Sequence, residues 1–327
     1  MIAPERIFEV QTAEQFAKQC LEVFRFQAEH NPIYRDFIGY LGRDVNAIQS
    51  LDQIPFLPIE FFKTHSITSK LGNPEIIFTS SGTTGMQQSR HLVMDLGLYE
   101  QSFQKAFERF YKKPENMAIL ALLPSYLERE GSSLIYMVDS LIDQSQQEES
   151  GYYLYNHQEL FETLKTLQRK NTPTLLIGVT YALLDFVEAY PQLNFPHLIV
   201  METGGMKGRR KEMIREEVHA QLTCAFGVEK IHSEYGMTEL LSQAYSKGDG
   251  LFTCPPWMRV LIRDTNDPLS YLPNEQTGGI NVIDLANVYS CSFIATQDLG
   301  KIHSSGEFEV LGRFDHSEIR GCNLLVV

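Results

Sequence analysis

Short apolar runs alternate along the chain with segments whose apolar residues recur at helical spacing. The apolar runs predict buried strands at 75–79, 117–124, 174–179 and 197–203. The helical spacing predicts helices over 11–40 (capped by Thr12), 96–111 and 181–190, and another with Ile214, Val218 and Leu222 on one face. This alternation favours an α/β fold with parallel strands, in which ligands bind beyond the carboxyl ends of the strands.

The last third of the chain has a different pattern. Short runs separated by Gly, Pro and Asn predict a mostly antiparallel β region at 256–264, 278–285, 290–300 and 306–313. We therefore expect three consecutive parts: an N-terminal helical segment (1–50), an α/β core (51–250) and a small β-rich subdomain (251–327). The biased tract QSQQEES at 144–150 predicts an exposed loop.

The charge balance limits the classes of partner. Lys and Arg number 28 against 41 Asp and Glu, a net charge of −13, and the basic residues form no concentrated stripe. Nucleic acid is not an expected partner, because phosphate backbones are bound through clustered Lys and Arg.

No apolar run reaches the roughly 20 residues of a membrane span, and the N-terminal residues lack the layout of a secretory signal. We therefore expect a cytoplasmic protein without integral membrane contact. The five scattered cysteines predict neither a disulfide framework nor a zinc site.

The first candidate for chemistry is the loop Thr79-Ser80-Ser81-Gly82-Thr83-Thr84-Gly85, directly after a predicted strand. Its hydroxyls and backbone N–H groups can surround a polyphosphate. A flexible surface turn has the same composition, so this loop alone leaves both interpretations open. It is not a Walker loop, because no Gly-Lys-Ser/Thr follows.

Two further loops follow predicted strands. The paired glycines of Glu202-Thr203-Gly204-Gly205-Met206-Lys207-Gly208 let a flat ligand approach the backbone, although a tight strand–helix turn uses the same residues. Glu234-Tyr235-Gly236-Met237-Thr238-Glu239 combines a ring for stacking with a glycine, a hydroxyl and two carboxylates. A carboxylate near a triphosphate commonly holds Mg²⁺, but Thr238 and Glu239 also suit a capped helix start.

The last two candidates are Gln297-Asp298-Leu299-Gly300 and Gly312-Arg313-Phe314-Asp315. An aspartate on a tight turn suits the two hydroxyls of a ribose, and a nearby arginine suits phosphate or ribose. Taken singly, each is more often a turn residue or a surface charge.

In this order the motifs resemble those of the adenylate-forming superfamily, which includes acyl-CoA synthetases, firefly luciferase and peptide-synthetase adenylation domains. The resemblance runs from about residue 50 to the end. LPIEFFKTH (57–65) and LPSYLE (123–128) look like the acyl-protein synthetase (LuxE-type) branch, which includes the fatty-acid-activating subunit of the bioluminescence fatty acid reductase. The resemblance implies an α/β fold: a large adenylate-forming domain with parallel-rich sheets and helices, whose core binds nucleotide and acyl group. A small C-terminal β region would end at the hinge-like Gly-Arg-Phe-Asp segment.

The resemblance also implies roles for individual residues, with ATP and Mg²⁺ as cofactors. Glu239 would ligate the metal, and Thr238 would contact the α-phosphate. The acid would lie against Pro124, Ser125, Tyr126, Gly178 and Thr180. The nucleotide would be bound by Ser80, Ser81, Gly82, Thr83, Thr84, Gly85, Gly204, Gly205, Met206, Tyr235, Gly236, Met237, Asp298 and Arg313.

The sequence departs from the superfamily pattern at two points. Larger members carry Pro-Lys just after the glycine loop, whereas this chain has MQQSR (86–90), so Arg90 is the nearest substitute and a candidate catalytic residue. They also continue beyond the Gly-Arg-x-Asp turn into a mobile lid domain with a lysine for adenylation. This sequence stops at Val327, so we expect that domain to be absent and its charge to come from another residue or a partner.

The implied reaction joins a carboxylic acid, expected to be a fatty acid, to AMP and then transfers the acyl group to a thiol. In the acyl-protein synthetase branch that thiol is a cysteine near the C-terminus, which makes Cys322 the candidate acyl acceptor. Neighbouring Arg320 would favour its thiolate, while a buried structural thiol is the alternative. Coenzyme A, an acyl carrier protein or a reductase subunit as acceptor stays open. A protein of another class, a non-catalytic nucleotide- or acyl-binding subunit, stays open as well.

Overall fold

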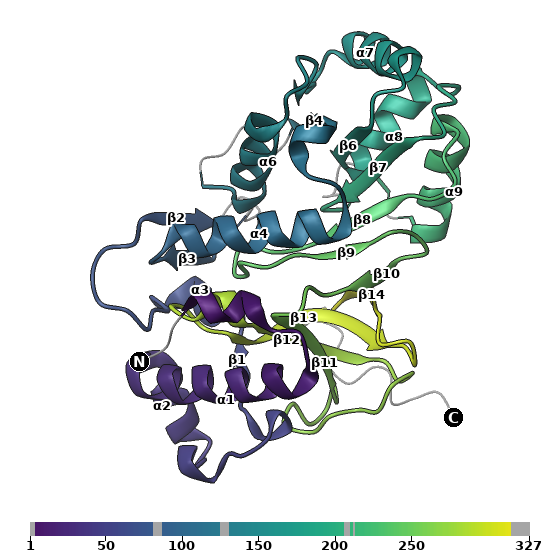
Figure 1. The fold of residues 1–327 in the computed structure, drawn as a ribbon. Coiled ribbons are helices and arrows are strands. Elements are labelled where there is room, and N and C mark those ends of the chain that lie inside the picture. The colour runs from purple at the N-terminus through teal and green to yellow at the C-terminus, as the bar shows by residue number, and fades with distance from the viewer. Residues whose placement is uncertain (1–3, 81–86, 125–130, 206–209, 212, 315–327) are drawn as a thin grey trace, which may run out of the picture. The chain divides into compact units, whose positions relative to one another are not determined.

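The computed structural model describes residues 4–80, 87–124, 131–205, 210–211 and 213–314 (Figure 1). The chain divides into two compact units that are not consecutive in sequence: Met1–Gly72 with Pro256–Val327, and Asn73–Pro255. The predicted N-terminal helices and the C-terminal strands therefore belong largely to one unit, while the three-part organisation (1–50, 51–250, 251–327) stays a prediction. Within the described residues, none of the helices combines the length and apolarity needed to cross a bilayer.

The N-terminal helical segment of the first unit contains two helices where one was expected. After the 3-10 helix η1 (Pro4–Glu9), α1 spans Ala13–His30 and α2 spans Pro32–Tyr40. Thr12 caps α1 as expected. Proline has no N–H and restricts the residue before it, so it starts a helix readily but does not continue one. Asn31 lies at this break between the helices. Its side-chain amide oxygen accepts from the N–H of Tyr34 at 3.1 Å and so caps α2.

The remaining elements of the first unit form a small sheet with short helices around it. The predicted antiparallel region is confirmed: β11 (Met258–Arg263), β12 (Gly278–Asp284), β13 (Phe293–Ile302) and β14 (Phe308–Arg313) pair in this order, all antiparallel. β1 (Leu57–Pro58) pairs parallel with the first half of β13. The short helices are η2 (Val45–Ala47), η3 (Leu51–Gln53), α3 (Phe61–Thr64) and η5 (Leu285–Asn287).

Buried polar side chains attach α1 and α2 to this sheet. The amide of Gln27 donates to the carbonyls of Asn287 and Val288, both at 2.9 Å, and its oxygen accepts from the N–H of Ser292 at 3.0 Å. The rings of Tyr34 and Phe293 stack with centroids 6.2 Å apart. Gln27 thus satisfies backbone groups that would otherwise be buried without partners.

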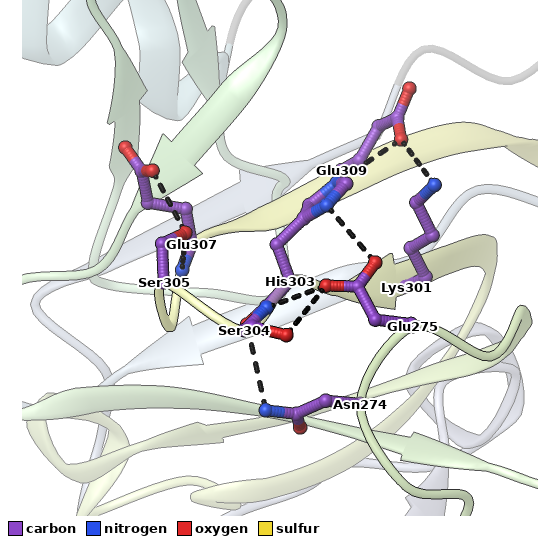
Figure 2. A network of polar contacts seen from close by, with 8 residues as sticks. All are labelled: Asn274, Glu275, Lys301, His303, Ser304, Ser305, Glu307 and Glu309. Carbon is purple, nitrogen blue, oxygen red and sulfur yellow. Dashed lines mark hydrogen bonds and ion pairs between the residues drawn. The ribbon is translucent and has the colours of Figure 1, made fainter.

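A polar network closes the turn between β13 and β14 (Figure 2). Glu275 accepts from the N–H of Ser304 at 2.7 Å and from its hydroxyl at 3.0 Å. The ring of His303 lies 3.4 Å from the carboxylates of both Glu275 and Glu309. Asp298 pairs with Arg313 at the other end of this hairpin, beyond a register shift at Leu299 and Gly300.

The second unit is built on a mixed sheet in the order β10–β9–β8–β7–β6–β4–β5. The predicted strands β4 (Ala118–Leu122), β6 (Thr174–Val179) and β7 (Leu198–Thr203) pair in parallel, as do β5 (Gly151–Tyr152) with β4 and β8 (His232–Tyr235) with β7. β9 (Ala244–Ser246) and β10 (Leu251–Thr253) extend the sheet antiparallel. The expectation of an α/β fold with parallel-rich sheets is confirmed.

The helices of this unit connect the parallel strands. They are α4 (Leu96–Phe110), η4 (Pro114–Asn116), α6 (Ser133–Gln144), α7 (His157–Lys170), α8 (Thr180–Ala189) and α9 (Arg215–Phe226). Val218 and Leu222 are buried on α9 as predicted, but Ile214 is 62% exposed at its N-cap, so its place on the buried face was wrong.

Two local expectations in this unit need correction. The strand predicted at 75–79 is β2 (Ile76–Thr79), but it pairs antiparallel with β3 (Arg90–Val93) in a separate two-stranded sheet. The tract 144–150 is partly packed rather than simply exposed. The hydroxyl of Ser145 donates to the carbonyl of Met117 at 2.7 Å, and that of Ser150 accepts from the N–H of Ile119 at 3.0 Å.

Candidate functional site

Most of the described candidate residues of the second unit lie at one edge of its sheet. Leu122, Gly178, Glu202 and Ser233 stand in register on β4, β6, β7 and β8. Because these strands are parallel, the residues that follow them reach the same edge. The sequence motifs supply those residues: Pro124, Thr180, Gly204, Gly205, Tyr235 and Gly236.

A carboxylate that is largely covered by its neighbours lies at this edge. Glu202 accepts hydrogen bonds from the hydroxyls of Thr180 (2.7 Å) and Ser233 (2.8 Å), on the two neighbouring segments. The ring of His219, on α9, has its Nε2 3.5 Å from the same carboxylate. Burial acts to raise the pKa of Glu202, but the His219 ring and the two hydroxyls outweigh it and hold the pKa below its ordinary value. Glu202 is therefore ionised at neutral pH and joins three strand ends and a helix.

A second carboxyl group, Glu234, lies beside the first with the opposite protonation preference. The hydroxyl of Thr203 donates to it at 2.7 Å. Burial raises the pKa of Glu234 to about 7, the Thr203 hydrogen bond opposes this rise, and the nearby Glu202 carboxylate adds to it. A Cβ atom at position 236 would collide with the Glu234 carboxyl. Gly236 therefore leaves the space in which this carboxyl lies.

The turn after β7 requires glycine. Gly204 and Gly205 both have positive φ angles, 72° and 62°, a region that other residues rarely adopt. Both are exposed, so their backbone N–H groups lie at the protein surface just beyond the carboxyl edge. Met206, the third predicted residue of this loop, lies outside the described residues.

Tyr235, Thr238 and Glu239 follow β8 closely. The Tyr235 ring is 8% exposed and packs edge-on against Phe252 with centroids 5.9 Å apart, so one side of it is already covered. The carbonyl of Thr238 lies 2.8 Å from Nδ1 of buried His91, on β3. Burial lowers the pKa of His91 to about 4, against the opposing effect of this hydrogen bond, so the ring is neutral and donates.

Glu239, the one predicted metal ligand, fits a metal ion that takes most of its ligands from phosphate and water. Glu239 is buried, with 6% of the residue exposed, in the segment that follows β8. Among the residues that the structure describes, no group of three His, Cys, Asp or Glu side chains surrounds a common point. Mg²⁺ commonly takes one or two protein carboxylates and completes its shell with phosphate and water, so a single carboxylate fits that mode and not an all-protein cage.

The first loop is described only at its two ends. Ser80 and Ser89 exchange two bonds: the N–H of Ser80 donates to the Ser89 carbonyl (3.1 Å), and the Ser80 hydroxyl accepts from the Ser89 N–H (2.9 Å). Arg90 is exposed at the start of β3, paired in register with Thr79. Ser81, Gly82, Thr83, Thr84 and Gly85 lie outside the described residues.

The predicted acyl-contact residues belong to the same edge. Pro124 is buried after β4, and Gly178 is so closely packed that a Cβ there would meet Leu183 at 2.8 Å. Thr180 is buried, and its hydroxyl is already donated to Glu202. Ser125, Tyr126 and the predicted acyl acceptor Cys322 lie outside the described residues.

The predicted ribose-binding pair belongs to the first unit. Arg313 Nε donates to the buried carboxylate of Asp298 at 3.1 Å, while 72% of the Arg313 side chain is exposed. The structure thus brings these two residues together across β13 and β14. Their joint action with the candidates of the second unit stays a prediction.

Sequence reasoning missed several polar residues of this edge. His91, His219 and Ser233 stood outside every predicted role, and the Glu202 and Glu234 carboxyls were noticed only as parts of motifs. One signal was present: the mainly apolar strand β7 and the partly buried strand β8 each carry a carboxyl group just before the turn.

No protein-family description and no curated protein sequence matches the chain. An open conformation of 2-hydroxyisobutyryl-CoA ligase, in complex with 2-HIB-AMP and CoA, is similar in fold, with a TM-score of 0.67 and 15% identity over 93% of this chain and 70% of that one. ATP-bound MatB from Rhodopseudomonas palustris has a TM-score of 0.56 and 18% identity over 74% of this chain.

These likenesses define the class of fold. The chain has the α/β fold of adenylate-forming ligases. It spans 49% of the length of MatB. At this level of identity the likeness concerns the fold alone, and the activity is a separate question.

Proposed function

We propose that this protein activates a carboxylic acid with ATP to form an acyl-AMP and then transfers the acyl group to a thiol. The observation that carries the proposal is the position of the motif residues. Segments far apart in sequence, after β4, β6, β7 and β8, reach one edge of a single sheet. Two of these segments carry adenylate-forming motifs, Thr203-Gly204-Gly205 at the end of β7 and Tyr235–Glu239 at the end of β8, on a fold of that class.

The first half-reaction joins two anions. A carboxylate oxygen attacks the α-phosphorus of ATP, the bond from that phosphorus to the bridging oxygen breaks, and pyrophosphate leaves with the electron pair. Hydrogen-bond donors and cations must offset the charges brought together. In this proposal Thr238 contacts the α-phosphate and Arg90 supplies positive charge. The remaining nucleotide contacts are Ser80, Ser81, Gly82, Thr83, Thr84, Gly85, Gly204, Gly205, Met206, Tyr235, Gly236, Met237, Asp298 and Arg313.

Glu239 would hold Mg²⁺, which supplies neutralisation of phosphate charge when bound. Neutral His91 holds the carbonyl of Thr238 and so orients the segment that carries both the threonine and the glutamate. The acid would lie along Pro124, Ser125, Tyr126, Gly178 and Thr180.

The second half-reaction needs a thiol. Its sulfur attacks the acyl carbon, the bond from that carbon to the phosphate oxygen breaks, AMP leaves and the thiol proton passes to solvent. We propose Cys322 as the first acceptor, a long-chain fatty acid as the acid, and a partner protein such as a reductase subunit as the final acceptor. These finer assignments rest on the resemblance to acyl-protein synthetases; coenzyme A or a carrier protein would serve the same chemistry.

Acid-dependent exchange of labelled pyrophosphate into ATP tests the first half-reaction. A panel of carboxylic acids, from short hydroxy acids to long-chain fatty acids, should give exchange with at least one chain-length class and none without acid. Absence of exchange with every acid would reject the proposal and favour a non-catalytic nucleotide- or acyl-binding subunit.

A cysteine comparison tests the acceptor. Cys322→Ser should abolish hydroxylamine-sensitive labelling of the protein by radioactive acid while leaving exchange intact. Cys224→Ser is the matched control, because Cys224 is an exposed free thiol, and it should leave both activities unchanged. Persistent labelling of the Cys322 variant would exclude this residue as the acceptor.

A further inference from the structure

A cleft lies at the edge of this sheet opposite the candidate functional site. A cleft of about 610 Å³ is lined by residues at or near the amino-terminal ends of parallel strands, among them Met117, Thr174, Ile199 and His232. Each of these strands runs from the cleft to the carboxyl edge described above. No residue predicted to bind nucleotide, acyl group or metal lines this cleft.

The charged residues of the cleft are all of one kind. Its lining includes two cationic side chains, Lys112 and Lys247, together with the imidazoles of His197 and His232 and no carboxylate, although the chain as a whole carries a net charge of −13. Within the described part of the chain, neither Lys112 nor Lys247 forms an ion pair. A concave surface lined by charges of one sign focuses its field and attracts ligands of the opposite sign.

Tyr111 provides an aromatic wall beside these charges. The ammonium of Lys247 lies 5.9 Å from the centroid of its ring, and its hydroxyl is 3.2 Å from Nδ1 of His232. Burial, and after it the Glu234 carboxyl, raise the pKa of Tyr111, so its phenol keeps the proton and remains a donor. Phe110, Met117 and Pro173 add apolar surface to the lining.

His232 reports the electrostatic character of the cleft. Burial lowers its pKa to about 4, and the positive charge of Lys247 adds to this effect. The imidazole is therefore neutral at pH 7 and would gain a proton more readily beside a negative charge.

We propose that this cleft binds a small amphipathic anion, a molecule with a phosphate or carboxylate group next to a flat apolar portion. The lysines and His232 would face the anionic group, and Tyr111 with the apolar residues would pack on the flat portion. The volume falls within the roughly 300–1,000 Å³ of ordinary small-molecule sites. Because the cleft lies at the edge opposite the candidate nucleotide site, this proposal does not depend on the proposed function.

Phenyl phosphate is the probe for the test, and isothermal titration calorimetry of the full chain without ATP gives its affinity. Saturable binding is expected, and it should weaken as salt rises. Lys247→Ala and Lys112→Ala should each weaken it by about tenfold, the loss of one charge-assisted contact. Lys230→Ala is the control: Lys230 is paired with Asp249 on the surface and does not line the cleft. Its affinity should stay within about twofold of the wild type.

The imidazole of His232 gives a second, local measurement on the wild-type protein. It stays valid even if a lysine variant fails to fold. Its NMR signal, assigned by its loss in His232→Gln, should titrate about one pH unit higher when phenyl phosphate is saturating. Benzyl alcohol, which has the ring without the charge, should not move it. An unchanged His232 titration with saturating phenyl phosphate, or equal binding by the cleft variants and the control, would overturn the proposal.

Discussion

The Glu234 carboxyl makes the stability of the protein depend on pH in a direction that one substitution can test. Burial raises the pKa of Glu234 from its ordinary value of 4.5 to about 7. Between these values the folded state holds a proton that the unfolded state has released, so the free energy of unfolding falls as pH rises through this window. Above pH 7 the full cost of ionising a buried carboxyl is present. The difference between 4.5 and about 7 corresponds to about 3 kcal/mol.

Glu234→Gln should remove this cost, because the amide is neutral at every pH and its oxygen can still accept from the Thr203 hydroxyl. At pH 5, where the wild-type carboxyl is mostly protonated, we expect the two proteins to be similar in stability. At pH 8 the variant should have the higher free energy of unfolding, by up to about 3 kcal/mol. Urea unfolding followed by circular dichroism at the two pH values measures both differences.

The control for this experiment is Glu148→Gln, which removes an exposed carboxylate of the same unit. It should change the free energy of unfolding by less than about 0.5 kcal/mol at either pH. If Glu234→Gln shifts the stability equally at pH 5 and pH 8, then Glu234 is ionised in the folded protein throughout this range. The assignment of a neutral carboxyl at the strand edge would then be wrong.

Three further substitutions test the contacts of Glu202, His91 and Gln27, the first and last by stability and the second by activity. Glu202→Ala leaves two buried hydroxyls without their acceptor and should lower the free energy of unfolding at pH 7 by about 3 kcal/mol. Exposed Glu217→Ala is its control in the same urea experiment and should cost less than about 0.5 kcal/mol. His91→Phe removes the donor to the carbonyl of Thr238. It should reduce acid-dependent ATP–pyrophosphate exchange about tenfold, because one hydrogen bond is lost in a site that must be held precisely. Unchanged exchange would mean that His91 has no positioning role. Gln27→Met leaves two backbone carbonyls and the N–H of Ser292 without their partner. It should lower the free energy of unfolding by about 2 kcal/mol in the urea experiment, whereas a cost near zero would mean that water replaces the amide.

The secondary structure was predictable wherever local pattern decides it. β4, β6 and β7 are fully or largely buried runs and were found with nearly correct bounds. The break between α1 and α2 was missed because the apolar spacing continues across Pro32, although proline at this position is a local signal.

The pairing partners of strands were less accessible to sequence reasoning. β2 has the composition of any short strand, and nothing in its own residues says that it pairs with β3 in a separate sheet. The division into units likewise depends on contacts between the two ends of the chain. The amide of Gln27 bonds to residues about 260 positions away, a relation that no local window contains.

The loops that form the candidate site could be predicted from the sequence, but the protonation states of its carboxyl groups could not. The motif residues could be placed at strand ends because parallel strands share a carboxyl edge. The protonation of Glu202 and Glu234 was not accessible, since it depends on neighbours from other segments. The pKa of Glu202 depends on its contacts with His219, Thr180 and Ser233. The pKa of Glu234 depends on its burial beside the Glu202 carboxylate.

The contrast between these two carboxyl groups bears on how the edge can act. They occupy adjacent parallel strands, each just before the turn that carries motif residues. Two ionised carboxylates this near each other would repel ATP and the acid, both anions. The structure limits that repulsion in two ways. Hydrogen-bond donors surround Glu202, and burial, with a smaller contribution from the Glu202 charge, keeps Glu234 protonated up to about pH 7. Environments that push the pKa values of paired groups apart are typical of catalytic sites. In the proposed reaction, a neutral Glu234 permits an anionic substrate to approach an edge that already contains a buried negative charge.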